Sequence, residues 1–467
     1  MSTASKTSST RLSDIVGASH VVQDPAELST YEAAGKIPEA AVRPGTKEEV
    51  VEIIKFAAAE GLAVVSCGAR TKLDMGLPPQ RYDLALDLTR LNRIIAYDPA
   101  DLTLAVEPGL LLRNITSALA EHRQFLPLLV PYSRQTTIGG TIASGVDSPM
   151  RQFYGTARDY ILGMEFVTGE GTLAKSGGRV VKNVSGYDLH KLMIGALGTL
   201  GVMVQINFKT FPAPVATRGF VATFEQMEQA VEMRQRVAQS PLTPITMEIF
   251  SPRVAELFSS DAAARIASGT MPANVISPKQ WAFTSGFAGN EKVLARYESE
   301  FRKIAGQFKA VQMTVLDDTT RPPAFSRKRE FVPISLSPAT SPATAILKIS
   351  VLPTHLKEAL ARAQQSAEAN GLPWAAMARG LGVIYFALLP EKRDEDSRRR
   401  VAQAAEQIFG ACSEWGANSA IPWCPSEWKG SLKVWGPERA DFSLMTNVKK
   451  VFDPQSILSP GRFAGGI

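Results

Sequence analysis

Glycine-rich segments in the first 202 residues constrain the fold of this chain more than any other feature of its sequence. They cover residues 68–71, 136–145 and 177–202. Glycine has no Cβ, so its backbone can turn sharply and can let a ligand or another chain segment approach closely. The first segment is neither the G-x-G-x-x-G fingerprint of dinucleotide-binding folds nor a Walker loop, and it therefore does not indicate those classes.

Two of these segments have the composition of a phosphate-binding turn. Residues 62–67 are predicted to form a strand that leads directly into Gly68-Ala69-Arg70-Thr71. Successive backbone N–H groups in such a turn can surround a phosphate, although an ordinary turn has the same pattern. In residues 136–145, paired glycines lie among small hydroxyl residues. That composition suits a flat ligand or a pyrophosphate, and it equally suits a loop packed tightly between two sheets.

Local signals also define two elements of the first domain. A capping box at Thr46 and Glu49, with a glycine at position 61, predicts a helix over residues 46–60. Two apolar runs on either side of Gly169-Glu170-Gly171 predict a hairpin. Strands and helices are therefore both expected before residue 212.

The third glycine-rich segment carries the most specific pattern. It reads Gly177-Gly178-Arg179-Val180-Val181-Lys182-Asn183-Val184-Ser185-Gly186-Tyr187-Asp188-Leu189, followed by Gly195-Ala196-Leu197-Gly198-Thr199-Leu200-Gly201-Val202. Together with the two earlier segments, with Phe153–Asp159 and with the closing Asp453–Arg462, it resembles the PCMH-type FAD-binding domain of the vanillyl-alcohol-oxidase superfamily. Within that superfamily it is most similar to the FAD-binding (E) subunits of bacterial glycolate oxidases. The resemblance covers about residues 40–214 and the C-terminal tail, and it is faint between them.

The resemblance implies an α+β fold with a two-lobed PCMH-type FAD-binding domain and a cap domain. The expected divisions are a disordered tail at residues 1–11, the FAD-binding domain at 12–214, the cap at 215–430, and a C-terminal segment at 431–467 that returns to the FAD-binding domain. Local patterns agree, because Pro212 and Pro214 interrupt the chain and longer strands then alternate with helices. That alternation predicts an antiparallel sheet covered by helices on one face.

The cofactor that the resemblance implies is FAD, and the motifs assign residues to it. The pyrophosphate loop would consist of Cys67, Gly68, Ala69, Arg70, Thr71, Lys72 and Leu73. The flavin or its phosphates would be contacted by Pro131, Thr136, Thr137, Gly139, Gly140, Ser144 and Gly145. Gly155 and Val202 would lie near the ribityl or adenine portion, and Arg462 would approach the ring. Several members of the superfamily attach FAD through a histidine in the pyrophosphate loop; this loop has none, so non-covalent binding is expected.

The substrate side departs from the best-known relatives. D-2-hydroxy-acid dehydrogenases of the superfamily carry the metal-linked motif G-H-x-G-D-G-N-x-H, whereas the equivalent residues 378–386 read A-R-G-L-G-V-I-Y-F, with Arg379 in place of the first histidine. The chain has four histidines and no spaced cluster of them, so no metal site is expected, and the usual base is missing. Arg329, Lys348 and Arg379 are the candidates to hold a substrate carboxylate. Solvated surface cations would give the same pattern.

Composition limits the remaining function classes. A net charge of +6 over 467 residues comes without basic tracts interleaved with aromatic residues, so nucleic-acid binding is not expected. Three cysteines, none in a C-x-x-C pair, fit a reducing compartment and exclude an internal iron–sulfur cluster, which needs about four thiolates. Neither a signal peptide nor a membrane span is expected. The expected location is the cytoplasm, or the periphery of a membrane reached through partners.

These features lead to two hypotheses of different classes. The first is an FAD-dependent oxidoreductase that converts a small 2-hydroxy acid, such as glycolate to glyoxylate, and passes electrons to a partner. Iron–sulfur and second flavin subunits would be those partners. The alternative is an FAD-binding electron-transfer or structural subunit of a glycolate oxidase complex without substrate chemistry of its own, which the missing histidine motif supports. A stand-alone oxidase using oxygen is a third possibility, for which the sequence supplies no identifiable group near the flavin.

Overall fold

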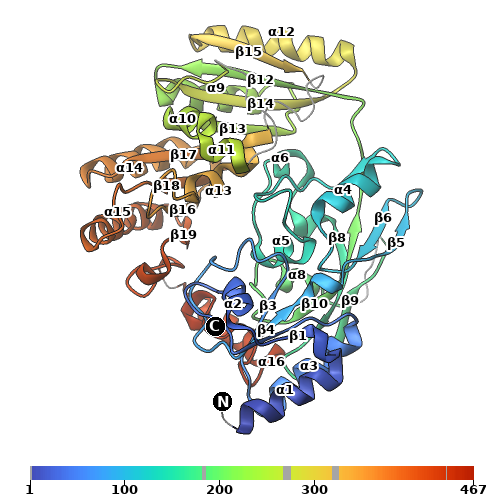
Figure 1. The fold of residues 1–467 in the computed structure, drawn as a ribbon. Coiled ribbons are helices and arrows are strands. Elements are labelled where there is room, and N and C mark those ends of the chain that lie inside the picture. Colours follow the sequence, from blue (N-terminus) through green and yellow to red (C-terminus); the bar gives the residue numbers. More distant parts are fainter. Residues whose placement is uncertain (1–2, 181–185, 267–274, 318–325, 438) are drawn as a thin grey trace.

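Three main sheets organise the chain, two in the N-terminal half and one in the C-terminal half. The computed structural model describes residues 3–180, 186–266, 275–317, 326–437 and 439–467. Val181–Ser185, in the middle of the third glycine-rich motif, and Met1 and Ser2 of the predicted tail lie outside the described residues. The N-terminal lobes form the lower part of Figure 1 and the sheet of the cap forms the upper part, with the C-terminus back among the N-terminal elements.

The first lobe contains a mixed four-stranded sheet. Its strand order is β1 (Val21–Val22), β2 (Ala40–Val42), β4 (Leu84–Asp87) and β3 (Val64–Cys67), with β4 parallel to both of its neighbours. The predicted helix is confirmed as α3 (Lys47–Glu60), whose N-cap Thr46 accepts a hydrogen bond from Glu49 N–H at 3.1 Å. Gly61 ends it at φ 66°. The capping box differs in one contact, because the Glu49 carboxylate accepts from Gly45 N–H.

The second lobe contains a five-stranded antiparallel sheet. Its order is β5 (Ile94–Asp98), β6 (Thr103–Val106), β10 (Val202–Lys209), β8 (Ile161–Val167) and β9 (Leu173–Gly177). The predicted hairpin is confirmed by the pairing of β8 with β9. The lobe also holds the helices α4 (Leu112–Ala120), α5 (Ile138–Ser144), α6 (Arg151–Tyr154), α7 (Ala157–Tyr160) and α8 (His190–Met193). The pair β7 (Gln124–Phe125) and β11 (Phe211–Pro212) closes the lobe before the cap begins.

The N-terminal segment is helical where the sequence predicts a disordered tail. Helix α1 spans Thr3–Val16, and α2 (Pro25–Leu28) follows it. The side chains of Leu12 and Val16 are buried in the same core as Val50, Ile53 and Ile54 of α3. The polar composition of residues 1–10 concealed this packing, because the buried residues lie in the second half of the helix.

The cap is an eight-stranded sheet in which every pairing is antiparallel. Its order is β15 (Gln312–Asp317), β12 (Ala216–Phe224), β14 (Trp281–Gly289), β13 (Thr246–Phe250), β17 (Trp374–Arg379), β18 (Val383–Leu388), β16 (Ala345–Ser350) and β19 (Asn418–Trp423). The predicted α+β class, with a PCMH-type domain and a helix-covered antiparallel sheet, is therefore confirmed.

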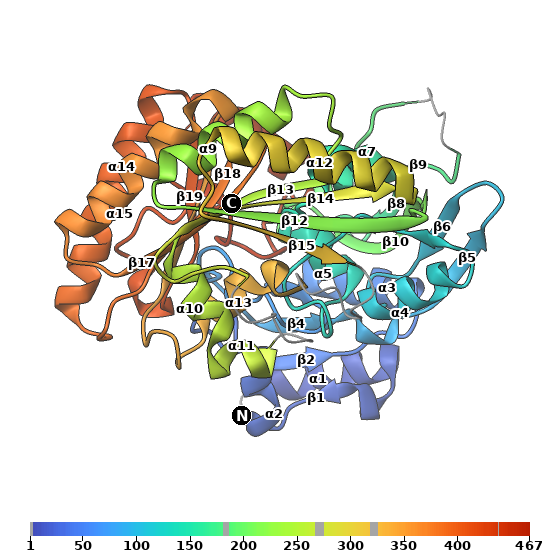
Figure 2. The ribbon, with the colours of Figure 1, turned by 90° about the horizontal axis from the view of Figure 1, so that it is seen from above.

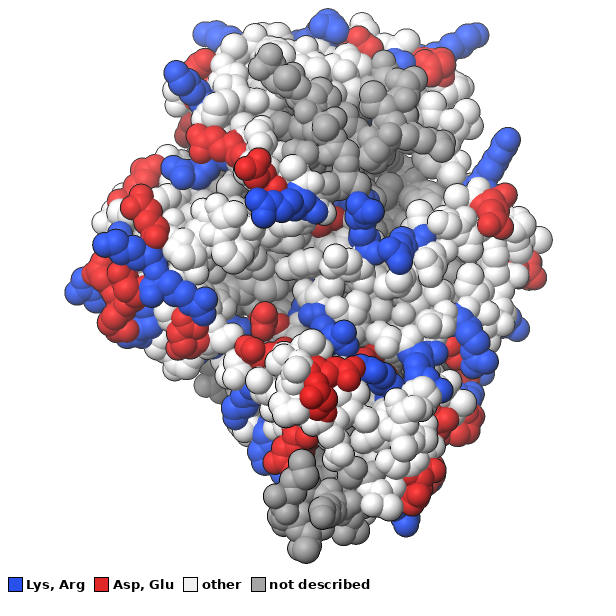
Figure 3. All heavy atoms as spheres, in the orientation of Figure 1, with Lys and Arg blue, Asp and Glu red and all other residues white. Residues whose placement is uncertain are grey.

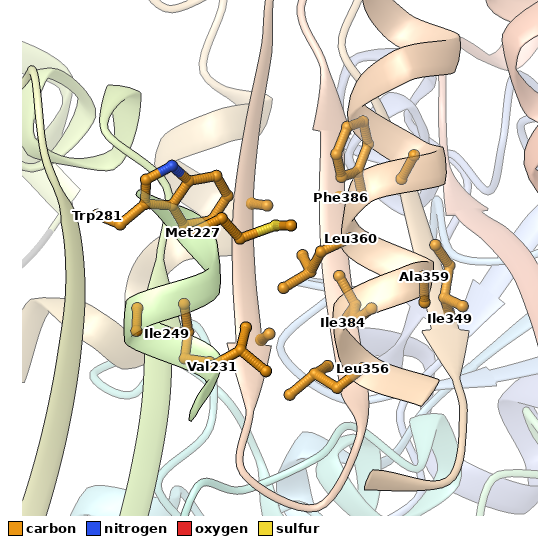
Figure 4. Close-up of a cluster of buried hydrophobic side chains, with 14 of the residues drawn as sticks. Met227, Val231, Ile249, Trp281, Ile349, Leu356, Ala359, Leu360, Ile384 and Phe386 are labelled. Atoms are coloured by element: carbon orange, nitrogen blue, oxygen red, sulfur yellow. The ribbon is translucent and has the colours of Figure 1, made fainter. Parts of the chain in front are cut away.

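Side-chain alternation gives the cap sheet two different faces. One face packs against four long helices, α9 (Met227–Ala238), α12 (Glu291–Gln307), α14 (Leu356–Ala369) and α15 (Glu395–Glu414) (Figure 2). Figure 4 shows part of this core, where Val231 of α9 and Leu360 of α14 approach Ile249 and Ile384 of the strands. The opposite face carries α10 (Arg253–Ser259), α11 (Asp261–Ile266) and α13 (Phe331–Leu336). Side chains on that second face reach the N-terminal lobes, as the 3.8 Å approach of Arg379 of β17 to Asp147 shows.

The C-terminal segment returns to the first lobe. Leu458 forms a parallel β-bridge with Val64 of β3, and Ser459 N–H donates to the Val64 carbonyl at 2.8 Å. Before it, α16 (Phe442–Phe452) carries a buried Lys449 whose Nζ lies 2.6 Å from the Asp453 carboxylate. The end of the chain is thereby placed beside the loop that follows β3.

Candidate functional site

Backbone N–H groups of the loop that follows β3 form a candidate anion site. The loop covers residues 67–73, and no acceptor among the described residues takes a hydrogen bond from the N–H groups of Gly68–Lys72. Arg70 adopts a left-handed conformation, φ 59°, which turns the backbone sharply there. Consecutive N–H groups on such a turn make a concave site for an anion.

The loop lies directly against the start of α5. A Cβ on Gly68 would be 2.2 Å from Thr137 Oγ1, so only glycine permits this approach. A small cavity of about 60 Å³ between the two segments is lined by residues 66–73 together with Thr137, Gly140, Ser144 and Arg462. Two segments that the sequence assigns to FAD therefore meet at one cavity.

Two arginines that line the small cavity hold this loop in place. Arg70 forms an ion pair with Asp87 at 3.1 Å. The buried Arg462 donates to the carbonyl oxygens of Leu73, at 2.5 Å, and Met75, at 2.9 Å. Both guanidinium groups therefore help to fix the loop.

Lys72 places a cation inside the same region. Its Nζ donates to Thr136 Oγ1 at 2.6 Å and to Thr71 Oγ1 at 3.1 Å, and it lies 5.7 Å from the ring centre of Tyr132. Burial lowers the pKa of Lys72 to about 7, against the opposing effect of the Glu330 carboxylate. An anion placed beside Lys72 would restore its positive charge.

A second cavity, of about 720 Å³, lies between the N-terminal lobes and the cap. Ser144 lines both cavities, so the two adjoin at the C-terminal end of α5. The N-terminal wall includes Gly145, Asp147, Arg151 and Gly155, while the cap contributes Lys348 and Ser350. On the face shown in Figure 3, several Lys and Arg side chains lie along the junction between the cap and the lower lobes.

A buried ion-pair cluster joins the cap to the wall of this large cavity. Glu248 of β13 is fully buried and accepts from Lys328 at 2.9 Å and from Arg379 at 2.5 Å. Arg379 Nε lies 3.8 Å from the Asp147 carboxylate, which also pairs with Arg151 at 3.1 Å. We call these five residues the ion-pair cluster. Its cations outnumber its carboxylates, and it crosses from the cap to the N-terminal lobes.

A further titratable side chain, that of Lys348, lies beside the cluster. Alternation along β16 places it on the same sheet face as Ile346, whose side chain packs away from the long helices. No described residue accepts a hydrogen bond from its Nζ, and the accessible part of the side chain lines the large cavity. Burial lowers the pKa of Lys348, the Asp147 carboxylate opposes that shift, and Arg151 adds to it.

Arg329 lies next to a cap residue that contacts the N-terminal lobe. Its Nε is 3.4 Å from Glu330 Oε1. Glu330 accepts from Tyr132 N–H at 2.8 Å and from the hydroxyl of Ser133 at 2.6 Å. The segment after Pro131 is thereby tied to the cap.

The structure brings some of the sequence-predicted residues together and separates others. The small cavity collects the loop 67–73, Thr137, Gly140, Ser144 and Arg462, and the large cavity collects Ser144, Gly145, Gly155 and Lys348. Pro131, Thr136, Gly139, Val202, Arg329 and Arg379 line neither of these two cavities. Thr136 nevertheless contacts Lys72, which lines the small cavity, and Arg379 lies beside Asp147, which lines the large one.

Four charged residues of the site were missed by the sequence analysis, namely Asp147, Arg151, Glu248 and Lys328. Glu248 left a usable signal, because a single carboxylate within the apolar strand β13 needs a buried partner. The others lie in ordinary polar surroundings in the sequence. Among the described residues, no three His, Cys, Asp or Glu side chains are grouped to bind a metal ion, and no helix has the length and apolarity to cross a membrane.

Comparison with known proteins identifies the class. The family model described as "FAD binding domain" matches residues 38–177, and "FAD linked oxidases, C-terminal domain" matches residues 213–418 and 434–463. The chain therefore belongs to the family of FAD-linked oxidases, and it is an FAD-dependent oxidoreductase.

Individual relatives agree with this assignment. "Glycolate oxidase subunit GlcD" of Bacillus subtilis is 24% identical over 427 residues, which cover 91% of this chain and 89% of the relative. "Glycolate oxidase subunit GlcE" of Escherichia coli is 34% identical over 189 residues, but these cover only 40% of this chain and 53% of the relative. The structure of 4-ethylphenol oxidase from Gulosibacter chungangensis shares the fold, with a TM-score of 0.76 at 16% identity, and the match covers 99% of this chain and 97% of that one.

The residues of the small cavity fit the cofactor of this family. A pyrophosphate needs several donors and a positive charge, and the N–H groups of Gly68–Lys72 and the Lys72 ammonium supply both. The absence of a Cβ at Gly68 keeps the approach between the loop and Thr137 open. The large adjoining cavity has the volume of a ligand pocket.

Proposed function

We propose that this chain oxidises a small 2-hydroxy acid to the 2-oxo acid, with glycolate and glyoxylate as the first candidate pair. The observation that carries the proposal is the excess of positive charge at the junction of the two domains. Arg151 lines the large cavity and Lys328 and Arg379 lie behind it, and these three cations face two carboxylates, those of Asp147 and Glu248. A low-dielectric site with surplus cations favours a small carboxylate.

The proposed binding mode for FAD is non-covalent. Cys67 is the loop residue whose thiol could form a covalent bond with the flavin. Burial raises the pKa of this thiol, so the reactive thiolate is disfavoured. No histidine lies in residues 67–73. Precipitation of the holoprotein with acid should leave all flavin absorbance in the supernatant, and yellow protein in the pellet would contradict the proposal.

The substrate is proposed to bind with its carboxylate toward the cations of the cap and its 2-hydroxyl toward the large cavity. FAD, when bound, supplies the two-electron oxidant that accepts a hydride. The protein supplies orientation: Arg151 on the cavity wall is the proposed carboxylate ligand, with Arg379 behind it, and Arg329, which lines neither cavity, remains a candidate that substitution tests. Arg379 is held in place by Glu248, so its geometry is fixed before the substrate arrives.

A dye-linked assay with matched substrates tests this proposal. Glycolate, D-lactate and L-lactate should be compared in turn, with an artificial electron acceptor present, and ethylene glycol serves as the analogue of glycolate without a carboxylate. At least one of the acids should reduce the dye, whereas ethylene glycol should not. Equal rates with glycolate and ethylene glycol would contradict carboxylate recognition by the cations.

The electrons are proposed to leave to a partner protein. All three cysteines are buried and unpaired, so an iron–sulfur cluster would have to come from another subunit, and a second flavin subunit is a further candidate. Unpaired thiols also support a reducing compartment such as the cytoplasm. Co-purification of an iron–sulfur protein with the tagged chain would support this assignment, and full turnover with oxygen alone would oppose it.

A second candidate function is an FAD-binding subunit without substrate chemistry. It is favoured by the match to a GlcE subunit and by Arg379 and Phe386, which stand where relatives carry two histidines. In that case no acid would reduce the dye with the isolated chain, although FAD would be bound.

A further inference from the structure

We propose that Lys348 takes the proton of the substrate hydroxyl, in place of the histidine that this chain lacks. This inference rests on the proposed oxidation of a 2-hydroxy acid. Oxidation of an alcohol to a carbonyl requires a proton acceptor, and positioned side chains serve that purpose in enzymes. The family resemblance implies a carboxylate contact for Lys348 instead, and the two roles lead to different experimental outcomes.

The position of Lys348 suits a proton acceptor. It lies in the middle of β16, between Tyr385 of β18 and Ala420 of β19, and it forms part of the wall of the 720 Å³ cavity. Strands on both sides restrict its backbone, which holds the side chain on the cavity face. Because no described residue accepts a hydrogen bond from its Nζ, the amine is available to a ligand in the cavity.

The other titratable groups nearby are less suitable. The Asp147 carboxylate is engaged by two guanidinium groups, since one oxygen pairs with Arg151 at 3.1 Å and the other lies 3.8 Å from Arg379. Glu248 is fully buried and accepts from Lys328 and Arg379. It therefore has no path to the cavity.

Tyr385, opposite Lys348 on β18, is also unsuitable. Burial raises the pKa of the Tyr385 phenol, and the Asp147 carboxylate raises it further. The phenol is therefore protonated over the whole range in which the enzyme would work, and it can donate a hydrogen bond but cannot accept the proton.

The surroundings of Lys348 shift its amine toward the neutral form. Burial disfavours the ammonium and lowers its pKa, Arg151 of α6 acts in the same direction, and Asp147 of the preceding loop acts against them. From the cap, Tyr385 is neutral and Arg379 is compensated by Glu248. A neutral lysine amine can act as a base, and burial produces such neutral lysines in other proteins.

The chemical step balances with FAD as the oxidant. The Cα–H bond breaks, and FAD, once bound, would be the two-electron oxidant that takes its electron pair as a hydride. The O–H proton goes to Nζ of neutral Lys348, which becomes an ammonium, and the Cα–O bond becomes the carbonyl of the 2-oxo acid. The ammonium then returns its proton to water in the cavity, which is open to solvent.

The variants Lys348→Arg and Lys348→Met test this assignment by anaerobic stopped-flow measurement of flavin reduction. Arginine keeps the positive charge but does not deprotonate, so it preserves a carboxylate contact and removes a base. Lys348→Arg should lower the reduction rate by about 10²–10⁴-fold, as should Lys348→Met. Lys357→Arg, on the exposed surface of α14, is the matched control and should keep the wild-type rate. A Lys348→Arg rate within about threefold of wild type would overturn the proposal.

The pH profile provides a readout that a purely structural role would not change. In the wild type the reduction rate should rise about tenfold per pH unit and level off below pH 10.5, the ordinary pKa of a lysine. This rise of the reduction rate with pH should be absent in the Lys348→Arg protein. In Lys348→Ala, added methylamine should restore part of the rate in proportion to its neutral form. An unchanged profile in Lys348→Arg, or no rescue in a Lys348→Ala protein that still binds FAD, would contradict the assignment.

Failure of this inference differs from failure of the proposed function. If no 2-hydroxy acid reduces the wild-type flavin, the proposed function is wrong and Lys348 has no substrate proton to accept. If the wild type is reduced and Lys348→Arg is reduced equally fast, the function stands and Lys348 is a carboxylate contact. Visible spectra of the variants before mixing show that each retains FAD.

Discussion

Replacement of Glu248 by glutamine is the perturbation whose consequence follows most directly from the structure. Glu248 is 0% exposed, and its carboxylate compensates the ammonium of Lys328 and the guanidinium of Arg379. Glutamine has the same shape and can still accept hydrogen bonds, but it has no charge. The substitution therefore isolates the electrostatic contribution without creating a cavity.

The expected loss of stability is large because the two cations remain buried. The side chains of Lys328 and Arg379 are 12% and 4% exposed, so water cannot replace the lost carboxylate. Removal of one partner from a buried ion pair costs about 3–5 kcal/mol. For a domain the size of the cap, this corresponds to a fall in Tm of roughly 6–20 °C, at about 2–4 °C per kcal/mol.

Differential scanning calorimetry of the holoprotein measures this loss, with Glu52→Gln as the control. Glu52 forms an ion pair with Lys55 at 2.9 Å, but the two side chains are 58% and 53% exposed. Exposed pairs contribute about 0–1 kcal/mol, so the control should change the Tm by at most a few degrees. A Glu248→Gln protein with the Tm of the control would refute the view that this carboxylate compensates buried cations.

Three further predictions concern the cofactor loop, the substrate and the C-terminal segment. FAD affinity of the apoprotein, measured by flavin fluorescence, should be constant below pH 7 and should fall by up to tenfold per pH unit above it, because an anion favours protonated Lys72. The Lys72→Met protein should bind FAD more weakly, and its affinity should not show this dependence on pH. Arg329→Ala should raise KM for glycolate by the equivalent of about 2–4 kcal/mol, and an unchanged steady-state profile would remove Arg329 from the site. Asp453→Asn should destabilise the holoprotein by about 3–5 kcal/mol in urea unfolding, since it leaves the charge of the buried Lys449 without a carboxylate; a loss below 1 kcal/mol would oppose this reading.

The parts of the site that the sequence predicted are those carried by contiguous residues. The turn after β3 and the segment 136–145 each contain their own glycines and hydroxyls, so each motif is visible without knowledge of the fold. Their meeting at one cavity, through Gly68 and Thr137, depends on the tertiary structure, and family resemblance alone implied it.

The ion-pair cluster could not be predicted from the sequence in the same way. Its members come from residues 147–151, 248, 328 and 379, and no local pattern relates segments so far apart. Strand alternation would have placed Glu248, Lys348 and Arg379 on one face of the cap sheet only if the strand boundaries and their register had been known. The helix at the N-terminus was missed for a related reason, since its buried residues follow a polar stretch.

Arg462 shows a further limit of sequence reasoning. The sequence predicted that it approaches the flavin, and the structure places it in the wall of the small cavity. Its hydrogen bonds, however, go to the carbonyl oxygens of Leu73 and Met75. Every residue has a backbone carbonyl, so a pattern of side chains cannot reveal such a contact.

The most direct test of the whole account is the anaerobic visible spectrum of the isolated holoprotein after addition of glycolate, D-lactate and L-lactate in turn. We predict that the holoprotein shows a flavin spectrum and that acid precipitation releases all of its flavin. Glycolate or one of the two lactates should bleach this spectrum without any partner protein. A flavin spectrum that none of these acids bleaches, under conditions in which dithionite does bleach it, would contradict the claim that this chain itself oxidises the substrate.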